Sequence, residues 1–183
     1  MTYVLAAAVI AVVVFMLIFG RGGVSSCKKL PRLIMYKLIY SDTHSGTKGE
    51  EDAYKGILYS PKYDLQGKPD MIYRHRLTGN IIIVEIKSGN CDWPHEGDML
   101  QVGTYMLIVE DIYLKRPKKA YISYKNNCFV VRNTHSLRND VLNTAQRMRD
   151  MLITGEEEPN ASFANCRHCV CDGTVCEFSQ MEE

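Results

Sequence analysis

Short apolar runs separated by turn residues predict most of the strands of this chain. Residues 56–59, 69–74 and 81–87 are three such runs, and the last, IIIVEIK, is the strongest of them. Its first half is apolar at every position, which is typical of a central strand covered on both faces. A further pair, 120–124 and 128–132, flanks a Lys-Asn-Asn turn and predicts a hairpin.

Other segments have the spacing of helices. A capping-box spacing at Thr47 predicts a helix over 48–55, and we expect a second helix over 97–111. Between 137 and 153 apolar residues recur at steps of three and four, which is typical of a surface helix with one buried stripe. That stripe consists of Leu137, Val141, Ala145, Met148 and Leu152. Residues 32–40 fit a helix or a strand. The order of these elements predicts an α/β fold with a mixed central sheet flanked by helices.

The N-terminal stretch 3–19 is apolar or small throughout and has no charge. Its length lies at the short end of what spans a bilayer. Because basic residues follow it and none precedes it, we interpret it as an uncleaved, single-pass transmembrane helix rather than a signal peptide. The positive-inside rule then places the rest of the chain in the cytoplasm, at the cell membrane. The expected organisation is an anchor over 1–20, a linker over 21–31 and an α/β domain over 32–183, with a cysteine cluster at about 164–178.

Charge and cysteine content narrow the choice of partners. The net charge is only +1, so contact with nucleic acid must be local, for example through basic residues at 74–76 or 115–119. Seven cysteines in a cytoplasmic domain argue against a disulfide framework, because that compartment keeps thiols reduced. Four of the seven lie within 166–176, a crowding that indicates metal or cluster binding.

The segment 67–87 carries the candidate chemistry. Asp70 follows a proline at the start of one predicted strand, while Glu85 and Lys87 are two residues apart on the next and emerge from one face. An acid and a base on so apolar a strand need a compensating partner, and a divalent cation between two carboxylates supplies one. Mg²⁺ prefers oxygen ligands, polarises phosphate and activates water, and Lys87 would orient that water or stabilise transition-state charge. Taken singly these residues are more often structural, but together they predict phosphodiester hydrolysis.

These residues resemble a known family. Pro69-Asp70 and Glu85-Ile86-Lys87 resemble the two signature elements of the PD-(D/E)xK nuclease superfamily. Gln101 and Tyr105 share a helix face and resemble the Gln-x-x-x-Tyr helix of its RecB-like branch. With the segment LYSPKYDLQGKPDMI and the C-terminal cysteines, residues 27–178 are similar to the CRISPR-associated RecB-like exonucleases (the Cas four family) and their free-standing relatives.

The resemblance implies a Mg²⁺- or Mn²⁺-dependent deoxyribonuclease, acting as an exonuclease on single-stranded ends of DNA. The family's first helix usually offers a histidine as a further metal ligand, and here Glu50 stands at that position, with Glu51 as the alternative. The implied metal ligands are Glu50, Asp70 and Glu85. The implied catalytic residues are Asp70, Glu85, Lys87, Gln101 and Tyr105. A catalytically weak DNA-binding or scaffold protein of the same fold is the alternative, and the complete set of site residues favours the enzyme.

The C-terminal cysteines are similar to those that hold a [4Fe–4S] cluster in such nucleases. The implied ligands are Cys27, Cys166, Cys169 and Cys176, with Cys171 as an alternative. A Zn²⁺ site made only from the four C-terminal cysteines is the rival interpretation. Either site would be structural, and we interpret Cys91 and Cys128 as packing residues. DNA and the membrane are thus the expected partners, with further protein partners left open.

Overall fold

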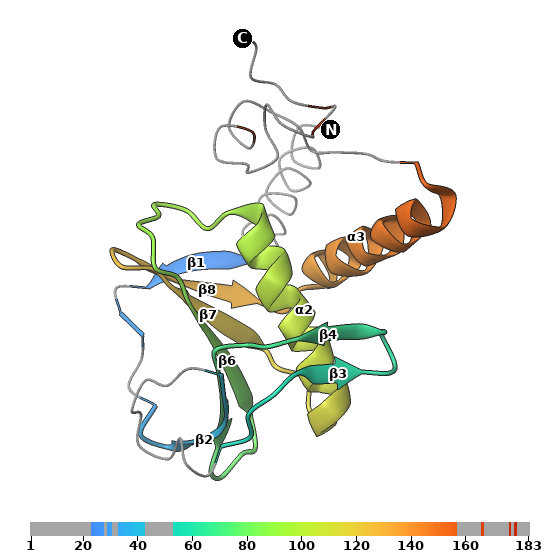
Figure 1. Cartoon of the computed structure of the whole chain (residues 1–183). Helices are drawn as coiled ribbons and strands as arrows, with labels where there is room; N and C mark the ends of the chain where they lie inside the picture. The colour runs from blue at the N-terminus through green and yellow to red at the C-terminus, as the bar shows by residue number, and fades with distance from the viewer. Residues whose placement is uncertain are drawn as a thin grey trace, which may run out of the picture. The chain divides into compact units, whose positions relative to one another are not determined.

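A computed structural model describes most of the chain between Gly23 and Glu156. The described residues are 23–27, 29–30, 33–42 and 53–156, together with residues 166, 176 and 178. The chain divides into two compact units, Met1–Val141 and Leu142–Glu183. The first unit contains the eight described strands, the helix α2 (Glu96–Tyr113) and the start of the helix α3 (His135–Thr154) (Figure 1).

A six-stranded mixed sheet forms the centre of the first unit. In spatial order its strands are β1 (Val24–Cys27), β8 (Cys128–Arg132), β7 (Lys119–Ser123), β6 (Ile81–Ile86), β5 (Met71–His75) and β2 (Tyr36–Ser41). Only β6 and β7 run parallel within this sheet. A parallel pair needs a crossover connection, and α2 supplies it. The hairpin of β3 (Leu58–Ser60) and β4 (Leu65–Gly67) forms a separate two-stranded sheet.

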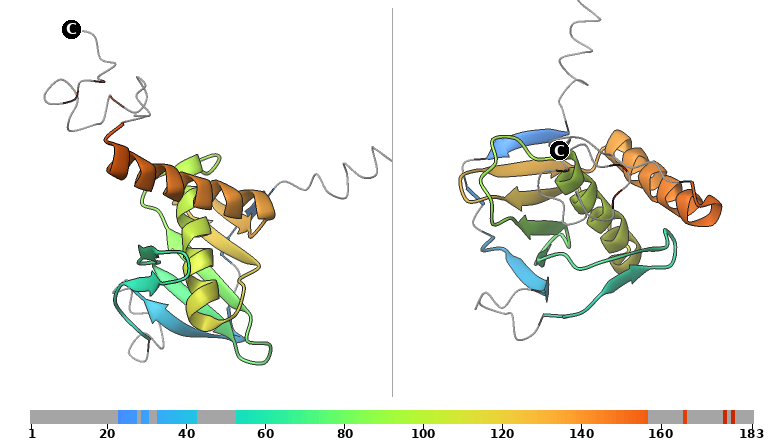
Figure 2. Two further views of the ribbon diagram at one scale, coloured as in Figure 1. Left: turned by 90° about the vertical axis from the view of Figure 1, so that its right-hand side faces the viewer. Right: turned by 45° about the horizontal axis from the view of Figure 1, so that its top comes forward.

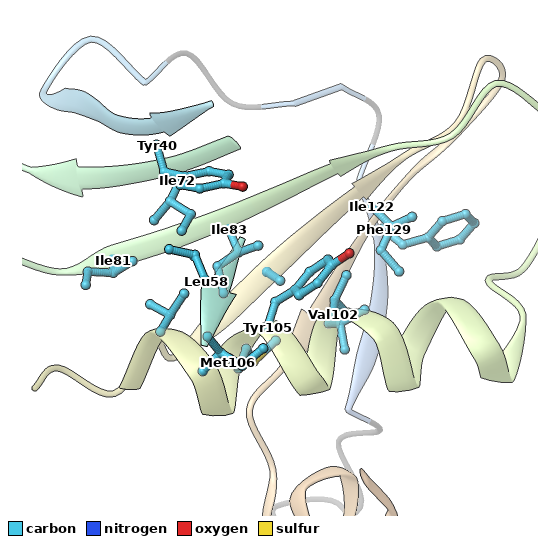
Figure 3. Packing of buried hydrophobic residues seen from close by; sticks show 14 of the residues in the cluster. Tyr40, Leu58, Ile72, Ile81, Ile83, Val102, Tyr105, Met106, Ile122 and Phe129 are labelled. Carbon is cyan, nitrogen blue, oxygen red and sulfur yellow. The ribbon is translucent and has the colours of Figure 1, made fainter. Parts of the chain in front are cut away.

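The strand β6 runs through the middle of two cores. All its residues from Ile81 to Glu85 are buried. Ile81 and Ile83 belong to the core beside α2, where Figure 3 labels them. Figure 2 shows α2 lying across one face of the sheet. Ile82 and Val84 belong to a second core on the opposite face. The prediction of a central strand covered on both faces is confirmed.

Most other predicted elements are also found, with ends that differ by one or two residues. The strands β3 and β5, the hairpin of β7 and β8, and the helices α2 and α3 match their predicted segments. The ambiguous segment 32–40 contains a strand, β2. On α3 the predicted buried stripe is wrong at Met148 and Leu152, which are 61% and 87% exposed, whereas Ala145 is half-buried. Periodicity identifies an apolar face but not what lies against it.

Two short strands were not predicted. Residues 24–27, assigned to a linker, form the edge strand β1, because they pair in register with β8. The strand β4 also escaped prediction. Residues 53–55 are not helical, and Tyr54 instead bridges to Tyr40. The rest of the helix predicted over 48–55, with Glu50 and Glu51, lies outside the described residues.

The membrane anchor is not among the described residues either. No helix in the described part of the chain is both long and apolar enough to cross a bilayer. Residues 1–20 lie outside that part.

Cys27 and Cys128 are directly opposite each other on β1 and β8 and form a disulfide, with their Cα atoms 5.0 Å apart. This pairing differs from the expectation that disulfides are absent and that Cys128 only packs. The physical reason is the register of β1, a strand that the sequence did not reveal. In the bonded form Cys27 offers no thiolate to a cluster, so its predicted role as a ligand applies only to the reduced chain.

The close packing of α2 gives a test of the fold. A Cβ atom at Gly103 would lie 2.8 Å from Val141 Cγ2 and 3.2 Å from Leu137 Cδ1. Gly103→Ala should therefore destabilise the chain by about 1–3 kcal/mol through overpacking, although alanine favours the helix. The matched control is Gly97→Ala in the same helix, where the added Cβ meets nothing within 4 Å and stability should rise or stay unchanged. Urea denaturation of both variants checks this, and equal midpoints would contradict the packing.

Candidate active site

Glu85 is the buried carboxylate at the centre of the site. It follows Ile81 and Ile83 on the face of β6 that α2 covers, and its side chain is 7% exposed. Gln101 Nε2 donates a hydrogen bond to Glu85 Oε1 over 2.9 Å. Glu85 Oε2 is buried and has no hydrogen-bond partner among the described residues. An unpaired buried carboxylate oxygen is costly, which indicates that a ligand belongs there.

Asp70 joins Glu85 across the hairpin of β5 and β6. Met71 pairs with Val84, so the residue before β5 comes beside Glu85. Asp70 Oδ2 also accepts a hydrogen bond from the backbone N–H of Ile86 over 2.6 Å. Burial and the negative charge of Asp70 together raise the pKa of Glu85 to about 7.

Lys87 presents its ammonium to the same place. Its Nζ lies 2.5 Å from Gln101 Oε1, 3.3 Å from Glu85 Oε1 and 3.0 Å from Asp98 Oδ1. Burial alone would lower the pKa of Lys87, but the two carboxylates outweigh burial and raise it. The lysine is therefore a cation in the site.

Two side chains of α2 organise these groups. Gln101 accepts from Lys87, and its amide Nε2 also donates to Tyr105 Oη over 2.9 Å. Tyr105 in turn donates to the carbonyl oxygen of Lys68 over 3.1 Å, just before Asp70. Its ring lies against Gly67, where a Cβ would come within 2.6 Å of Tyr105 Cε1. A glycine at this position lets the strand that leads to Asp70 approach the helix.

The structure thus brings together the five predicted catalytic residues, Asp70, Glu85, Lys87, Gln101 and Tyr105. Sequence reasoning missed Asp98, which contacts Lys87. Its only signal was its place on α2, three residues before Gln101 and on the same helix face.

The donors at this site suit a hard divalent cation. Asp70 and Glu85 are adjacent carboxylates, and Glu85 Oε2 has no partner in the described part of the chain. Carboxylate oxygens are the ligands that Mg²⁺ prefers. The described residues contain no group of three or more His, Cys, Asp or Glu that could hold a metal ion. The predicted third ligand, Glu50 or its alternative Glu51, lies outside them.

The cysteines assigned to a second site are only partly described. Cys166 and Cys176 belong to the second unit and are free thiols, the first buried and the second half-buried. Cys169 and Cys171 lie outside the described residues.

Comparison with known proteins now decides the family. A family model of the PD-(D/E)XK nuclease superfamily matches residues 27–177. The chain belongs to this superfamily. It is therefore a nuclease by family, a phosphodiester hydrolase on an α/β fold. No curated protein matches the chain. Among solved structures it is similar to "Crystal structure of SSO0001", with 13% identity and a TM-score of 0.48 over 98% of this chain and 72% of that chain.

The raised pKa of Glu85 makes the stability of this nuclease depend on pH. The folded-state pKa of about 7 exceeds the ordinary value of 4.5, so between these values the folded chain keeps a proton that the unfolded chain has lost. Stability without divalent cations should therefore fall as pH rises through this window and stay lower above it. Glu85→Gln removes this loss, and we expect its free energy of unfolding to exceed that of wild type at about pH 8 by roughly 3 kcal/mol, with little difference at about pH 4.

Thermal unfolding in chelator at the two pH values measures this difference. Added Mg²⁺ should raise the melting temperature of the wild type at the higher pH more than that of Glu85→Gln. Parallel pH profiles for the two proteins would show that Glu85 is not the titrating group.

Proposed function

We propose that this chain is a Mg²⁺- or Mn²⁺-dependent deoxyribonuclease that cleaves DNA from single-stranded ends. The observation that carries the proposal is the buried Glu85 Oε2 beside Asp70, which finds no hydrogen-bond partner among the residues that the structure describes. The Lys87 ammonium lies 3.3 Å from the other Glu85 oxygen. Metal-assisted phosphodiester hydrolysis uses carboxylates that hold the metal ion and a positively charged group close to them. Asp70 and Glu85 supply the carboxylates, and the Lys87 ammonium supplies the charge.

Each side chain has a distinct task in this mechanism. Asp70 and Glu85 would hold the cation, which when bound polarises the phosphate and lowers the pKa of water. Lys87 orients the attacking water or stabilises negative charge that develops on the phosphate oxygens. Gln101 holds Glu85 and Lys87 at once through its two amide atoms. Tyr105 anchors Gln101 to the segment before Asp70, so that the two acids keep their spacing.

The preference for single-stranded DNA ends has a separate basis. It follows from the resemblance to the RecB-like exonucleases, carried here by Gln101, Tyr105 and the C-terminal cysteines. The nearly neutral chain, with its net charge of +1, also favours local contacts over binding along a duplex.

Cleavage assays on the full chain test the proposal. With Mg²⁺ or Mn²⁺ and end-labelled single-stranded DNA, duplex DNA and RNA, we expect fastest loss of label from single-stranded DNA. Glu85→Ala and Lys87→Ala should each reduce the rate by at least about a hundredfold without unfolding the chain. Glu96→Gln, an exposed acid on the first turn of α2, is the control and should cleave like wild type. Binding of DNA without cleavage by the wild type would favour the scaffold alternative.

We also propose that the C-terminal cysteines hold a structural [4Fe–4S] cluster, as the resemblance to the Cas four family implies. The alternative is that they hold Zn²⁺. The support is the Cys166–Cys176 spacing and the free thiols of these two residues. A fourth thiolate from Cys27 requires that its bond to Cys128 is reduced, as the cytoplasm would keep it.

Metal content separates the two forms of this site. Protein purified without oxygen and with a thiol reductant should be brown and contain about four irons per chain, and Cys27→Ser should remove the colour. Cys128→Ser, which leaves Cys27 free, is the matched control and should keep it. A colourless protein with about one zinc, unaffected by Cys27→Ser and damaged by Cys171→Ser, would establish the zinc site instead.

The membrane placement is a further part of the proposal. It rests on the uncharged stretch 3–19 and the basic residues after it. A full-length chain in the membrane fraction would support this placement, and secretion of a shortened chain would overturn it.

A further inference from the structure

Asp98 contacts the site from α2, and no signature element of the family includes it. It lies three residues before Gln101, so both side chains extend from one face of the helix. Asp98 Oδ1 is 3.0 Å from Lys87 Nζ, and the Asp98 side chain is only 18% exposed. Its second oxygen, Oδ2, accepts a hydrogen bond from Tyr124 Oη over 2.5 Å.

Lys87 is held by three groups at once. An ammonium has three N–H donors, and Gln101 Oε1, Glu85 Oε1 and Asp98 Oδ1 are its three partners. Of these, Gln101 is neutral and Glu85 is a proposed metal ligand. If Glu85 held a metal ion, Asp98 would be the contacting carboxylate that still offsets the positive charge of Lys87. Without Asp98, a dication and an ammonium would repel each other across a short distance.

Tyr124 holds the Asp98 carboxylate in the orientation that contacts Lys87. Tyr124 lies just after β7, is 8% exposed, and packs edge-on against Phe129 with ring centroids 5.9 Å apart. Its hydroxyl donates a hydrogen bond to Asp98 Oδ2, so that Asp98 Oδ1 contacts Lys87. The carboxylate therefore cannot rotate without breaking a partly buried hydrogen bond.

We infer that Asp98, held by Tyr124, is a positioning residue that keeps the Lys87 ammonium aimed at the scissile phosphate of the nucleic-acid substrate. The inference rests on the proposed function for its catalytic meaning, but the Asp98–Lys87 contact itself does not. We expect its effect to be on turnover, because Asp98 acts through its contact with Lys87.

A plain structural role for Asp98 makes a different prediction. Asp98 and Glu96 are both acids in the first turn of α2, where a negative charge interacts favourably with the helix dipole and stabilises the helix. If that were the whole role of Asp98, removing either charge would have the same effect. Glu96→Gln is therefore the matched control for Asp98→Asn.

Kinetics on the full chain give the first measurement. With single-stranded DNA and Mg²⁺, we expect Asp98→Asn to lower kcat by about tenfold to a hundredfold, the usual cost of losing an orienting partner, while KM changes by less than about twofold. Tyr124→Phe should lower kcat less, and Asp98→Glu, which restores the charge, should recover part of the loss. Glu96→Gln should match wild type. Should Asp98→Asn fail to fold, Tyr124→Phe carries the same comparison.

The second measurement does not depend on activity. In protein with ¹⁵N-labelled lysine, an ammonium with three partners exchanges its protons slowly and gives an Nζ signal, assigned to Lys87 by its absence in Lys87→Arg. The signal should vanish in Asp98→Asn and persist in Glu96→Gln. If wild type fails to cleave DNA, the proposed function fails, while this signal still decides the contact. The inference is overturned if the Lys87 signal is the same in wild type and Asp98→Asn, or if Asp98→Asn cleaves within about twofold of Glu96→Gln.

Discussion

Burying a carboxylate in the most apolar strand of the sheet is the constraint on which the site depends. Glu85 lies on the same face as Ile81 and Ile83, in a layer that otherwise excludes charge. An isolated ionised group there would cost many kcal/mol. Gln101 and Lys87 offset the charge on one oxygen, and the other oxygen is left for a cation. The polar end of α2 and the acid on the neighbouring hairpin are arranged around this one group.

The helix α2 serves both the core and the site. Val102, Met106 and Val109 are fully buried, because the sheet, the β3–β4 hairpin and the start of α3 surround the middle of the helix. Its N-terminal half instead carries polar groups, Asp98 and Gln101, toward the end of β6. A helix buried nearly all round lacks a clear apolar stripe. The rigid packing of its middle turns is therefore what fixes the polar groups at its beginning.

The sequence allowed prediction of those features that depend on local spacing. Strand alternation predicts that Glu85 and Lys87 share a face, and the helical repeat predicts the same for Gln101 and Tyr105. The β5–β6 hairpin register then brings Asp70 beside Glu85. The contacts that escaped prediction join distant segments. Tyr124 reaches Asp98 from beyond the crossover, and Cys27 meets Cys128 through an edge strand of four residues that looks like a linker. Spacing carries no information about such pairs, because they depend on which strands become neighbours.

The side chains of the site come from one short stretch of the chain, and this limits which substitutions can remove them. Every side chain proposed to act on the phosphate, as far as the structure describes them, comes from the stretch between Asp70 and Tyr105, a single hairpin followed by one helix. Outside this stretch, the described residues support these side chains without belonging to them: Tyr124 holds Asp98, and the Lys68 carbonyl oxygen anchors Tyr105. Substitutions outside this stretch that also spare those two supports would therefore leave the side chains proposed to act on the phosphate in place.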